Sequence, residues 1–252
     1  MSNEEPESEW QYEPAADLNL SAGAALRSAV REPGLVGSAT TRCCWFFVER
    51  WLRRRFALKV EGGDRLPSRP PFVMVANHSS HLDALVLGAA APAAIRHRLF
   101  PIAAGDTFFE TRTSAVLSAF LLNALPMWRD NCGLHALKSL RQRLVDGRGA
   151  LILFPEGTRT RTGMMNPFKP GAGMLVAGTA VPVIPCYIRG AFEAWPPDAK
   201  RPKFGAVSVC IGEAMTFDQV EYRRAGWQQI SDQMQQTVEV LRTGVRTEAH
   251  SR

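Results

Sequence analysis

Residues 71–83 read PFVMVANHSSHLD, and this stretch decides how the rest of the chain is interpreted. Its first half, residues 71–76, is apolar throughout and has the length and composition of a buried β-strand. Residues 82–91 follow as a helix-favouring segment that Pro92 ends. His78 therefore lies where a strand ends and a helix begins. In parallel α/β sheets, this is the edge at which ligands bind.

His78 and Asp83 form the candidate catalytic pair within this stretch. On one straight helix, residues five apart would point about 140° from each other. The two side chains can therefore meet only if His78 lies in the loop and Asp83 in the first helical turn. An imidazole held by a carboxylate can take a proton from a hydroxyl, because the carboxylate fixes the tautomer and stabilises the imidazolium. Two alternatives stay open: Asp83 as a simple helix cap, and a metal site of His78, His81 and Asp83, for which no Cys/His cluster elsewhere supplies a further ligand.

From residue 71 onward, strand-like and helix-like segments alternate. Apolar runs lie at about 71–76, 98–103, 125–128, 150–154 and 182–188, and helix-like segments at about 82–91, 113–122, 133–146 and 171–180. Residues 203–211 add a further strand, and residues 217–243 a closing helix with an apolar stripe. Runs that are apolar throughout are typical of strands covered on both faces. The pattern predicts one α/β domain over residues 59–252, with a mostly parallel central sheet flanked by helices.

The 252 residues are enough for one sizeable core, and their charge is unevenly distributed. Residues 1–34 are expected to form an acidic, disordered tail, since residues 1–20 hold six acidic and no basic side chains. Residues 21–252 then hold 30 basic against 18 acidic side chains, a formal net charge of +12. A basic body of this kind is expected to meet anions, such as phosphates, anionic lipid or nucleic acid.

Residues 35–58 are expected to form a helix in which aromatic side chains alternate with arginines. Such a helix suits a lipid interface, or else packs on the core while its arginines extend into water. The chain has no uncharged apolar stretch of about 18 residues and no signal-peptide pattern. Its five cysteines include no Cys-x-x-Cys pair, which favours a reducing compartment. We therefore expect a cytoplasmic protein, peripherally associated with the inner face of the cell membrane.

Four further motifs make the chain resemble a known family. The Asn77-His78-x4-Asp83 pattern resembles the first motif of the glycerolipid acyltransferases, which include the 1-acylglycerol-3-phosphate acyltransferases. Residues 154–159 (FPEGTR), 168–173 (FKPGAG) and 183–185 (VIP) resemble its later blocks, and residues 58–62 (LKVEG) its opening strand. Order and spacing agree over roughly residues 55–215. One departure lies in the arginine-bearing second motif, residues 123–129 (NALPMWR), where Asn123 stands in place of the usual glycine.

The resemblance implies a glycerol-3-phosphate acyltransferase-like fold and a specific reaction. A fatty acyl group would pass from acyl-CoA or an acyl carrier protein to the hydroxyl of 1-acyl-sn-glycerol-3-phosphate, making phosphatidic acid in phospholipid biosynthesis. His78 would be the general base, with Asp83 orienting it, and no metal or redox cofactor is implied. Direct attack by the acceptor hydroxyl also fits a sequence without a Gly-x-Ser-x-Gly elbow. The residues expected to bind substrate are Arg129, Glu156, Gly157, Thr158, Arg159 and Lys169.

The expected role of each follows from chemistry and from the resemblance. Arg129 and Arg159 each follow a predicted strand, and guanidinium groups match phosphate oxygens with two parallel hydrogen bonds. Lys169 would add a third positive charge. By resemblance, Glu156 binds the glycerol moiety or the arginine beside it. Gly157 would allow close approach of the backbone to the ligand.

Other acceptors and another class of function remain possible at this stage. A lyso-ornithine lipid, another lysophospholipid or glycerol-3-phosphate could replace the acceptor. A non-catalytic basic module that binds anionic membrane or nucleic acid would explain the charge, but not the His78–Asp83 pair beside two arginines. The partners we expect are therefore a lysophospholipid, the acyl donor and a membrane surface, and not nucleic acid.

Overall fold

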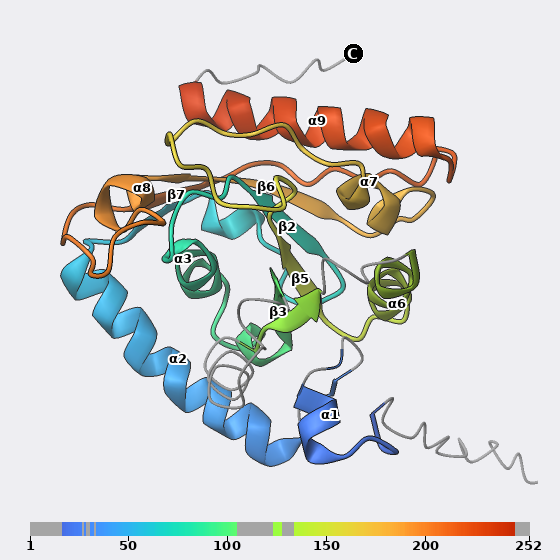
Figure 1. The fold of residues 1–252 in the computed structure, drawn as a ribbon, viewed down its shortest axis with the longest axis horizontal. Helices are drawn as coiled ribbons and strands as arrows, with labels where there is room; N and C mark the ends of the chain where they lie inside the picture. Colours follow the sequence, from blue (N-terminus) through green and yellow to red (C-terminus); the bar gives the residue numbers. More distant parts are fainter. Residues whose placement is uncertain are drawn as a thin grey trace, which may run out of the picture.

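A seven-stranded sheet is the centre of the protein in the computed structural model, which describes residues 17–26, 28, 31, 32, 34–104, 123–127 and 134–244 (Figure 1). The strands are β1 (Lys59–Glu61), β2 (Val73–Ala76), β3 (Leu99–Ala104), β4 (Leu125–Met127), β5 (Ala150–Leu153), β6 (Val183–Arg189) and β7 (Ser208–Ile211). Their order across the sheet is β1-β7-β6-β2-β5-β3-β4. Only the β6–β7 pair is antiparallel among these strands. The predicted α/β fold with a mostly parallel sheet is confirmed.

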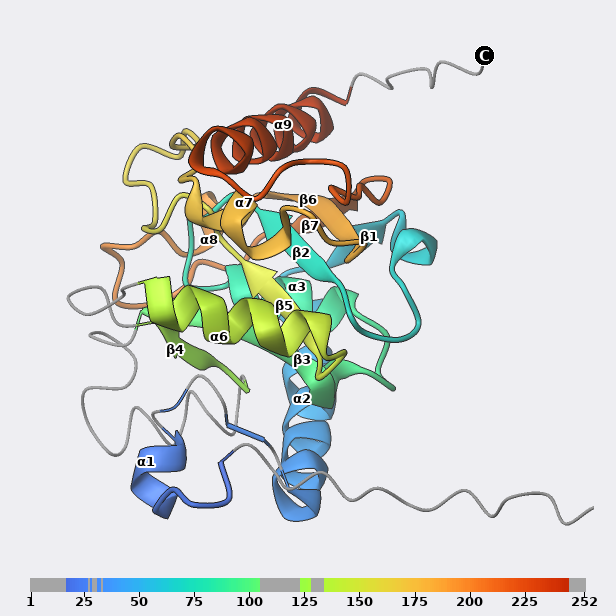
Figure 2. The same cartoon turned by 90° about the vertical axis from the view of Figure 1, so that its right-hand side faces the viewer.

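Helices cover both faces of the sheet (Figures 1 and 2). The helices are α1 (Ala22–Leu26), α2 (Leu35–Arg55), α3 (Asp83–Ala90), α6 (Leu134–Val145), α7 (Gly171–Val176), α8 (Ala191–Ala194) and α9 (Arg224–Thr243), with 3-10 turns η1 (Gly63–Arg65) and η2 (Arg96–Arg98). Helices α2 and α3 lie on one face, and α6, α7 and α9 on the other. The sheet is thus the middle layer of three.

This three-layer arrangement explains why the predicted strands are apolar at every position. In β2, Met74 and Ala76 belong to the core cluster on the α2 and α3 side. Val73 and Val75 belong to the cluster beneath α6, α7 and α9. All four side chains are fully buried, because successive side chains point to opposite faces and each face is covered.

Helix α2 packs through one face and leaves another exposed. Trp45 and Leu52 are buried in the core. Gly88 of α3 makes room for the Trp45 ring, since a Cβ added at Gly88 would lie 2.1 Å from it. Phe46 and Phe47 are each 63% exposed. Among the described residues, no helix is both long and apolar enough to cross a membrane.

Three of the predicted elements are shorter in the structure by four residues or more. Helix α7 ends at Val176, shortly before Gly178, whose φ of 65° is left-handed. Strand β7 begins only at Ser208, because Ser208 pairs with Arg189, the last residue of β6. Helix α9 begins at Arg224 rather than 217, since the carbonyl of buried Phe217 instead accepts the Gly178 N–H in a loop contact. The predicted helix at 113–122 lies outside the described residues.

The C-terminal end of the predicted acidic tail is packed against the domain. Arg31 is buried, and its Nη2 donates to Asn123 Oδ1 at 3.0 Å. Arg143 Nη1 donates to the Arg31 carbonyl at 2.9 Å, and Glu32 forms an ion pair with Arg148 at 3.0 Å. Residues 31 and 32 therefore belong to the folded body, while residues 1–16 lie outside the described part of the chain.

The contact between α7 and α9 gives a stability prediction. A Cβ added at Gly173 would lie 2.0 Å from the Trp227 carbonyl oxygen, so Gly173→Ala should force the helices apart. Overpacking of this kind destabilises by about 1–3 kcal/mol, which urea unfolding would measure. Gly205→Ala is the control, because an added Cβ there meets nothing within 4 Å. Its effect should stay within about 0.5 kcal/mol, and an equal effect of both changes would contradict the close helix contact.

Candidate active site

Asn77 fixes the start of the loop that carries His78. Its side chain is buried immediately after β2, where the backbone ladder to β6 ends. Its Nδ2 donates to the Ile188 carbonyl at 3.0 Å, and its Oδ1 accepts the Ile188 N–H at 2.8 Å. The amide thus continues the pairing with β6 for one more residue, which holds the loop against the sheet edge.

His78 and Asp83 meet as the sequence predicted. His78 lies in the loop and Asp83 is the first residue of α3. His78 Nδ1 is 2.8 Å from Asp83 Oδ2, and the Asp83 side chain is fully buried. Asp83 Oδ2 also accepts the backbone N–H groups of Ser79 at 2.6 Å and Ser80 at 2.8 Å. Asp83 therefore both orients the imidazole and accepts the backbone N–H groups of the loop before the helix.

This set of contacts decides which ring nitrogen of His78 is basic. An oxygen that accepts two backbone N–H groups is an acceptor toward the imidazole as well, so Nδ1 carries the proton and donates it. The lone pair then lies on Nε2. The His78 side chain remains 23% exposed, so a hydroxyl group can reach it. An imidazole oriented in this way by a carboxylate is chemically able to take a proton from a hydroxyl group.

The loop after β5 holds His78 from the other side. The ring of Phe154 stacks on the His78 ring, with centroids 4.1 Å apart and an angle of 15° between the planes. The Thr160 N–H donates to the His78 carbonyl at 2.9 Å. Since β2 and β5 are parallel neighbours, their C-terminal loops meet at one edge, and the ring of His78 is fixed by both.

Glu156 is a buried carboxylate that ties loop segments together. Its Oε1 accepts the His78 N–H at 2.6 Å, and its Oε2 accepts the Asn166 N–H at 2.8 Å. Burial raises the pKa of Glu156 above the usual range, although these two backbone donors act in the opposite sense. The resemblance assigns Glu156 to the glycerol moiety or to the arginine beside it. In the structure, its carboxylate accepts a backbone N–H of the loop that carries His78.

Gly157, Thr158 and Lys169 lie at the exposed rim beyond Glu156. Gly157 has a φ of 72°, and a Cβ added there would lie 2.7 Å from Lys169 Nζ. The Lys169 side chain therefore crosses directly over the glycine. The backbone N–H of Lys169 donates to the Pro155 carbonyl, which anchors this cation to the same loop. Lys169 therefore places a positive charge at the rim formed by Gly157, Thr158 and Lys169.

Arg159 lies beside His81 rather than standing alone at the strand end. Its Nη1 is 2.6 Å from His81 Nδ1 and 3.0 Å from Nε2, and the arginine is half-buried. His81 Nε2 also lies 3.1 Å from the Pro197 carbonyl. Burial and then Arg159 lower the pKa of His81. Arg129, the second predicted arginine, lies outside the described residues.

Sequence reasoning missed the contribution of the loop after β6. The Trp195 carbonyl accepts the Ser80 hydroxyl at 2.7 Å, and the Trp195 ring contacts the His81 ring. The available signal was the topology, because β6 is a parallel neighbour of β2 and its C-terminal loop must reach the same edge. Phe154 was missed as a contact of His78, although it begins the predicted FPEGTR motif.

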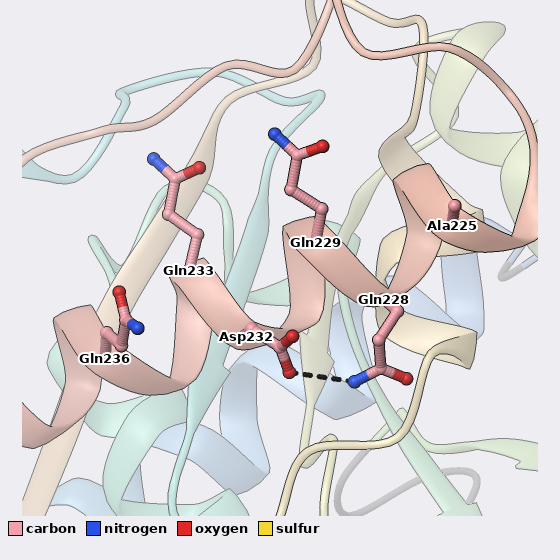
Figure 3. Close-up of a pocket in the computed structure, with 6 residues that line it drawn as sticks. All are labelled: Ala225, Gln228, Gln229, Asp232, Gln233 and Gln236. Carbon is pink, nitrogen blue, oxygen red and sulfur yellow. Dashed lines mark hydrogen bonds between the residues drawn. The ribbon is translucent and has the colours of Figure 1, made fainter.

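A metal centre and a surface hollow are two other features to consider among the described residues. Within the described residues, no three His, Cys, Asp or Glu side chains could hold a metal ion, and the ring nitrogens of His81 are engaged by Arg159 and Pro197. An open hollow lies on the solvent side of α9 (Figure 3). It is lined by Ala225, Gln228, Gln229, Asp232, Gln233 and Gln236. Gln228 donates to Asp232 at 2.8 Å, and none of the predicted site residues lines this hollow.

A comparison with family models matches residues 57–189 to the Acyltransferase family. The chain is 32% identical over 130 residues to human 1-acyl-sn-glycerol-3-phosphate acyltransferase alpha, covering 51% of this chain and 44% of that relative. It is 27% identical over 203 residues to the human beta enzyme, covering 79% of this chain and 70% of that relative. The chain therefore spans less than half the length of the alpha relative it matches.

The fold is similar to that of a solved acyltransferase. The crystal structure of the 1-acyl-sn-glycerophosphate (LPA) acyltransferase PlsC from Thermotoga maritima superposes with a TM-score of 0.59 and 23% sequence identity. The superposition covers 82% of this chain and 81% of that chain. The similarity includes the three-layer α/β arrangement on which the site is built.

Proposed function

Because the chain belongs to the acyltransferase family, we propose that it transfers a fatty acyl group from an acyl thioester to the hydroxyl of a lysophospholipid. The proposed acceptor is 1-acyl-sn-glycerol-3-phosphate, which appears in the names of both human relatives. The product is then phosphatidic acid. The donor is acyl-CoA or an acyl carrier protein. The observation that carries the proposal is the 2.8 Å contact of His78 Nδ1 with buried Asp83 at the end of β2.

The proposed reaction needs no covalent acyl-enzyme. Nε2 of His78 takes the proton of the acceptor hydroxyl as its oxygen attacks the thioester carbonyl carbon. A new C–O bond forms and the C–S bond breaks. The departing thiolate takes the proton back from the His78 imidazolium, so the base is regenerated. Asp83 stabilises that imidazolium while it exists, because its carboxylate lies 2.8 Å from Nδ1 and is shielded from water.

The phosphate of the acceptor is assigned to the positive rim. Arg159 follows β5 at the same sheet edge as His78, and Lys169 crosses the exposed backbone of Gly157 nearby. A guanidinium can hold two phosphate oxygens at once. Arg129 is proposed as a second arginine for the same group, on the basis of its motif.

We propose that the exposed face of α2 binds the inner surface of the cell membrane. Phe46 and Phe47 protrude from it, and Arg42, Arg50 and Arg54 are exposed on the same helix. Aromatic rings beside arginines suit the boundary between acyl chains and anionic headgroups. The proposed acceptor is a membrane lipid, so such binding would keep the site close to where the acceptor resides.

The first test of the proposed function replaces the base. His78→Ala should lower acyl transfer by about 10²–10⁴-fold, because general-base catalysis contributes this much. Purified protein would be assayed with acyl-CoA and an acyl carrier protein against glycerol-3-phosphate and a panel of lysolipids. His97→Ala is the matched control, since His97 is also half-buried but lies before β3, at the opposite edge of the sheet. Activity of folded His78→Ala within threefold of wild type would exclude the mechanism.

The second test concerns the acceptor phosphate. Arg159→Ala should raise the KM for 1-acylglycerol-3-phosphate and leave the donor KM nearly unchanged. A hydrogen bond to a charged group contributes about 1.5–3 kcal/mol, so roughly ten- to hundredfold in kcat/KM is expected. Arg159→Lys should recover little, because an ammonium cannot make the planar two-bond contact. Arg161→Ala, an exposed arginine in the same loop, is the control. A rise in donor KM alone would reassign Arg159 to the donor.

The third test concerns the membrane. Replacing Phe46 and Phe47 together by Ser should reduce co-sedimentation with anionic liposomes by roughly tenfold or more, since burying one Phe is worth about 1.5–3 kcal/mol. Val145→Ser is the control, because Val145 is 53% exposed on α6, on the other face of the sheet. Added salt should weaken binding of the wild type, because exposed arginines are screened over about 10 Å at 0.1 M. Unchanged sedimentation of the double variant would rule out this face.

A further inference from the structure

His81 is engaged on both sides by groups from two different loops. Arg159, from the loop after β5, brings Nη1 to 2.6 Å from Nδ1 of the ring. The Pro197 carbonyl, from the loop after α8, lies 3.1 Å from Nε2, and the Trp195 ring packs 5.1 Å from the imidazole. His81 therefore connects the candidate phosphate-binding arginine to the loop that follows α8.

These contacts require one protonation state of the ring. A carbonyl oxygen can only accept a hydrogen bond, so Nε2 carries the proton and donates it to Pro197. Arg159 Nη1 lies 2.6 Å from Nδ1 and 3.0 Å from Nε2, so this guanidinium nitrogen lies over the face of the imidazole. A cation so close to both ring nitrogens is compatible with the neutral ring, whose proton is on Nε2, and not with an imidazolium.

Protonation of His81 would break the contact with Arg159. It would set two positive charges side by side, with the guanidinium nitrogen within 3.0 Å of both nitrogens of the imidazolium. The other charged groups near the ring are Asp83 and His78, on its own loop and α3. The loop after α8 contributes an uncharged ring and a carbonyl, and the acidic side chains of this region, Glu193 and Asp198, are exposed.

We infer that His81 is a positioning residue, which holds the Arg159 guanidinium in place for the acceptor phosphate and releases it when the ring is protonated. This rests on the proposed function of Arg159. Acceptor binding then depends on pH through a histidine that does not touch the substrate. The two residues are 78 positions apart, so the coupling exists only because the loops after β2 and β5 meet.

The direction of the pH effect follows from the contacts. Burial and Arg159 lower the pKa of His81 below its ordinary value of 6.5, so the ring is neutral above that value. The contact with Arg159 is therefore fully present above about pH 6.5 and is lost as the pH falls through the lowered pKa. The acceptor KM of the wild type should rise over this acidic range.

The experiment compares two substitutions of His81 on one acceptor. His81→Ala should raise the KM for 1-acylglycerol-3-phosphate by roughly threefold to tenfold at pH 7.5, the size expected for losing a close contact between a cation and a ring, with kcat within about threefold. His81→Asn should keep the acceptor KM close to that of wild type at pH 7.5, because its amide oxygen can accept from Arg159. This side chain does not titrate, so the acidic rise in KM should be reduced. The phosphate itself titrates near pH 6, but equally for every variant.

Two further measurements separate this inference from the proposed function. If Arg159→Ala raises the acceptor KM, then His81→Ala added to it should have no further effect. The His81 ring, followed by NMR, should titrate at a higher pH in Arg159→Ala, because a neighbouring cation has been removed. An effect of Arg159→Ala without any effect of His81→Ala would overturn the inference alone. No effect of Arg159→Ala would overturn the phosphate assignment instead.

A second histidine–arginine contact supplies the matched control. His97 lies 3.4 Å from Arg42 Nη2, and burial and then Arg42 lower its pKa as well. His97 lies before β3 and Arg42 on α2, away from the edge that carries His78. His97→Asn should leave the acceptor KM and its pH dependence as in wild type. If His97→Asn reduced the acidic rise in KM as His81→Asn does, the assignment to His81 would be wrong.

Discussion

One buried oxygen, Asp83 Oδ2, holds the candidate site together. It accepts the ring N–H of His78 and the backbone N–H groups of Ser79 and Ser80, so three groups of the loop depend on it. These three donors to Oδ2 offset much of the cost of burying this carboxylate. The same contacts that stabilise the charge of Asp83 therefore set the path of the loop and the tautomer of His78. Asp83 is therefore at once a structural residue of the loop and a candidate catalytic residue.

Two segments that follow parallel strands complete the arrangement. The loop after β5 supplies Phe154, Glu156 and Arg159, and the loop after α8, the short helix that follows β6, supplies Trp195 and Pro197. Both strands are direct neighbours of β2, which places their C-terminal ends at one edge. Each loop contacts the segment from His78 to His81 through backbone groups as well as side chains, so the candidate base is held on several sides.

Helix α2 reaches the same edge by a different route. Its last residue lies four positions before β1, whose Lys59 pairs with Ser208 of β7. Ser208 in turn pairs with Arg189, the final residue of β6. The C-terminal end of α2 therefore lies at the edge where β2 and β6 end. Arg42, one turn before Phe46, instead contacts His97 before the start of β3. Helix α2 therefore runs from one edge of the sheet to the other, and Phe46 and Phe47 lie between its two ends.

The sequence by itself determined the sheet, the helices on both faces and the meeting of His78 with Asp83. These features depend on neighbours in the chain: an apolar run of strand length, a helix start, and a loop short enough to bring residues five apart together. Only the tertiary structure decided that Glu156 is directed at the His78 backbone and that Arg159 lies on His81. It also decided that α9 begins at Arg224, because the Phe217 carbonyl accepts the N–H of Gly178 in a loop contact. Such contacts join residues that are far apart in the chain, and they depend on how the loops pack, which local periodicity does not encode.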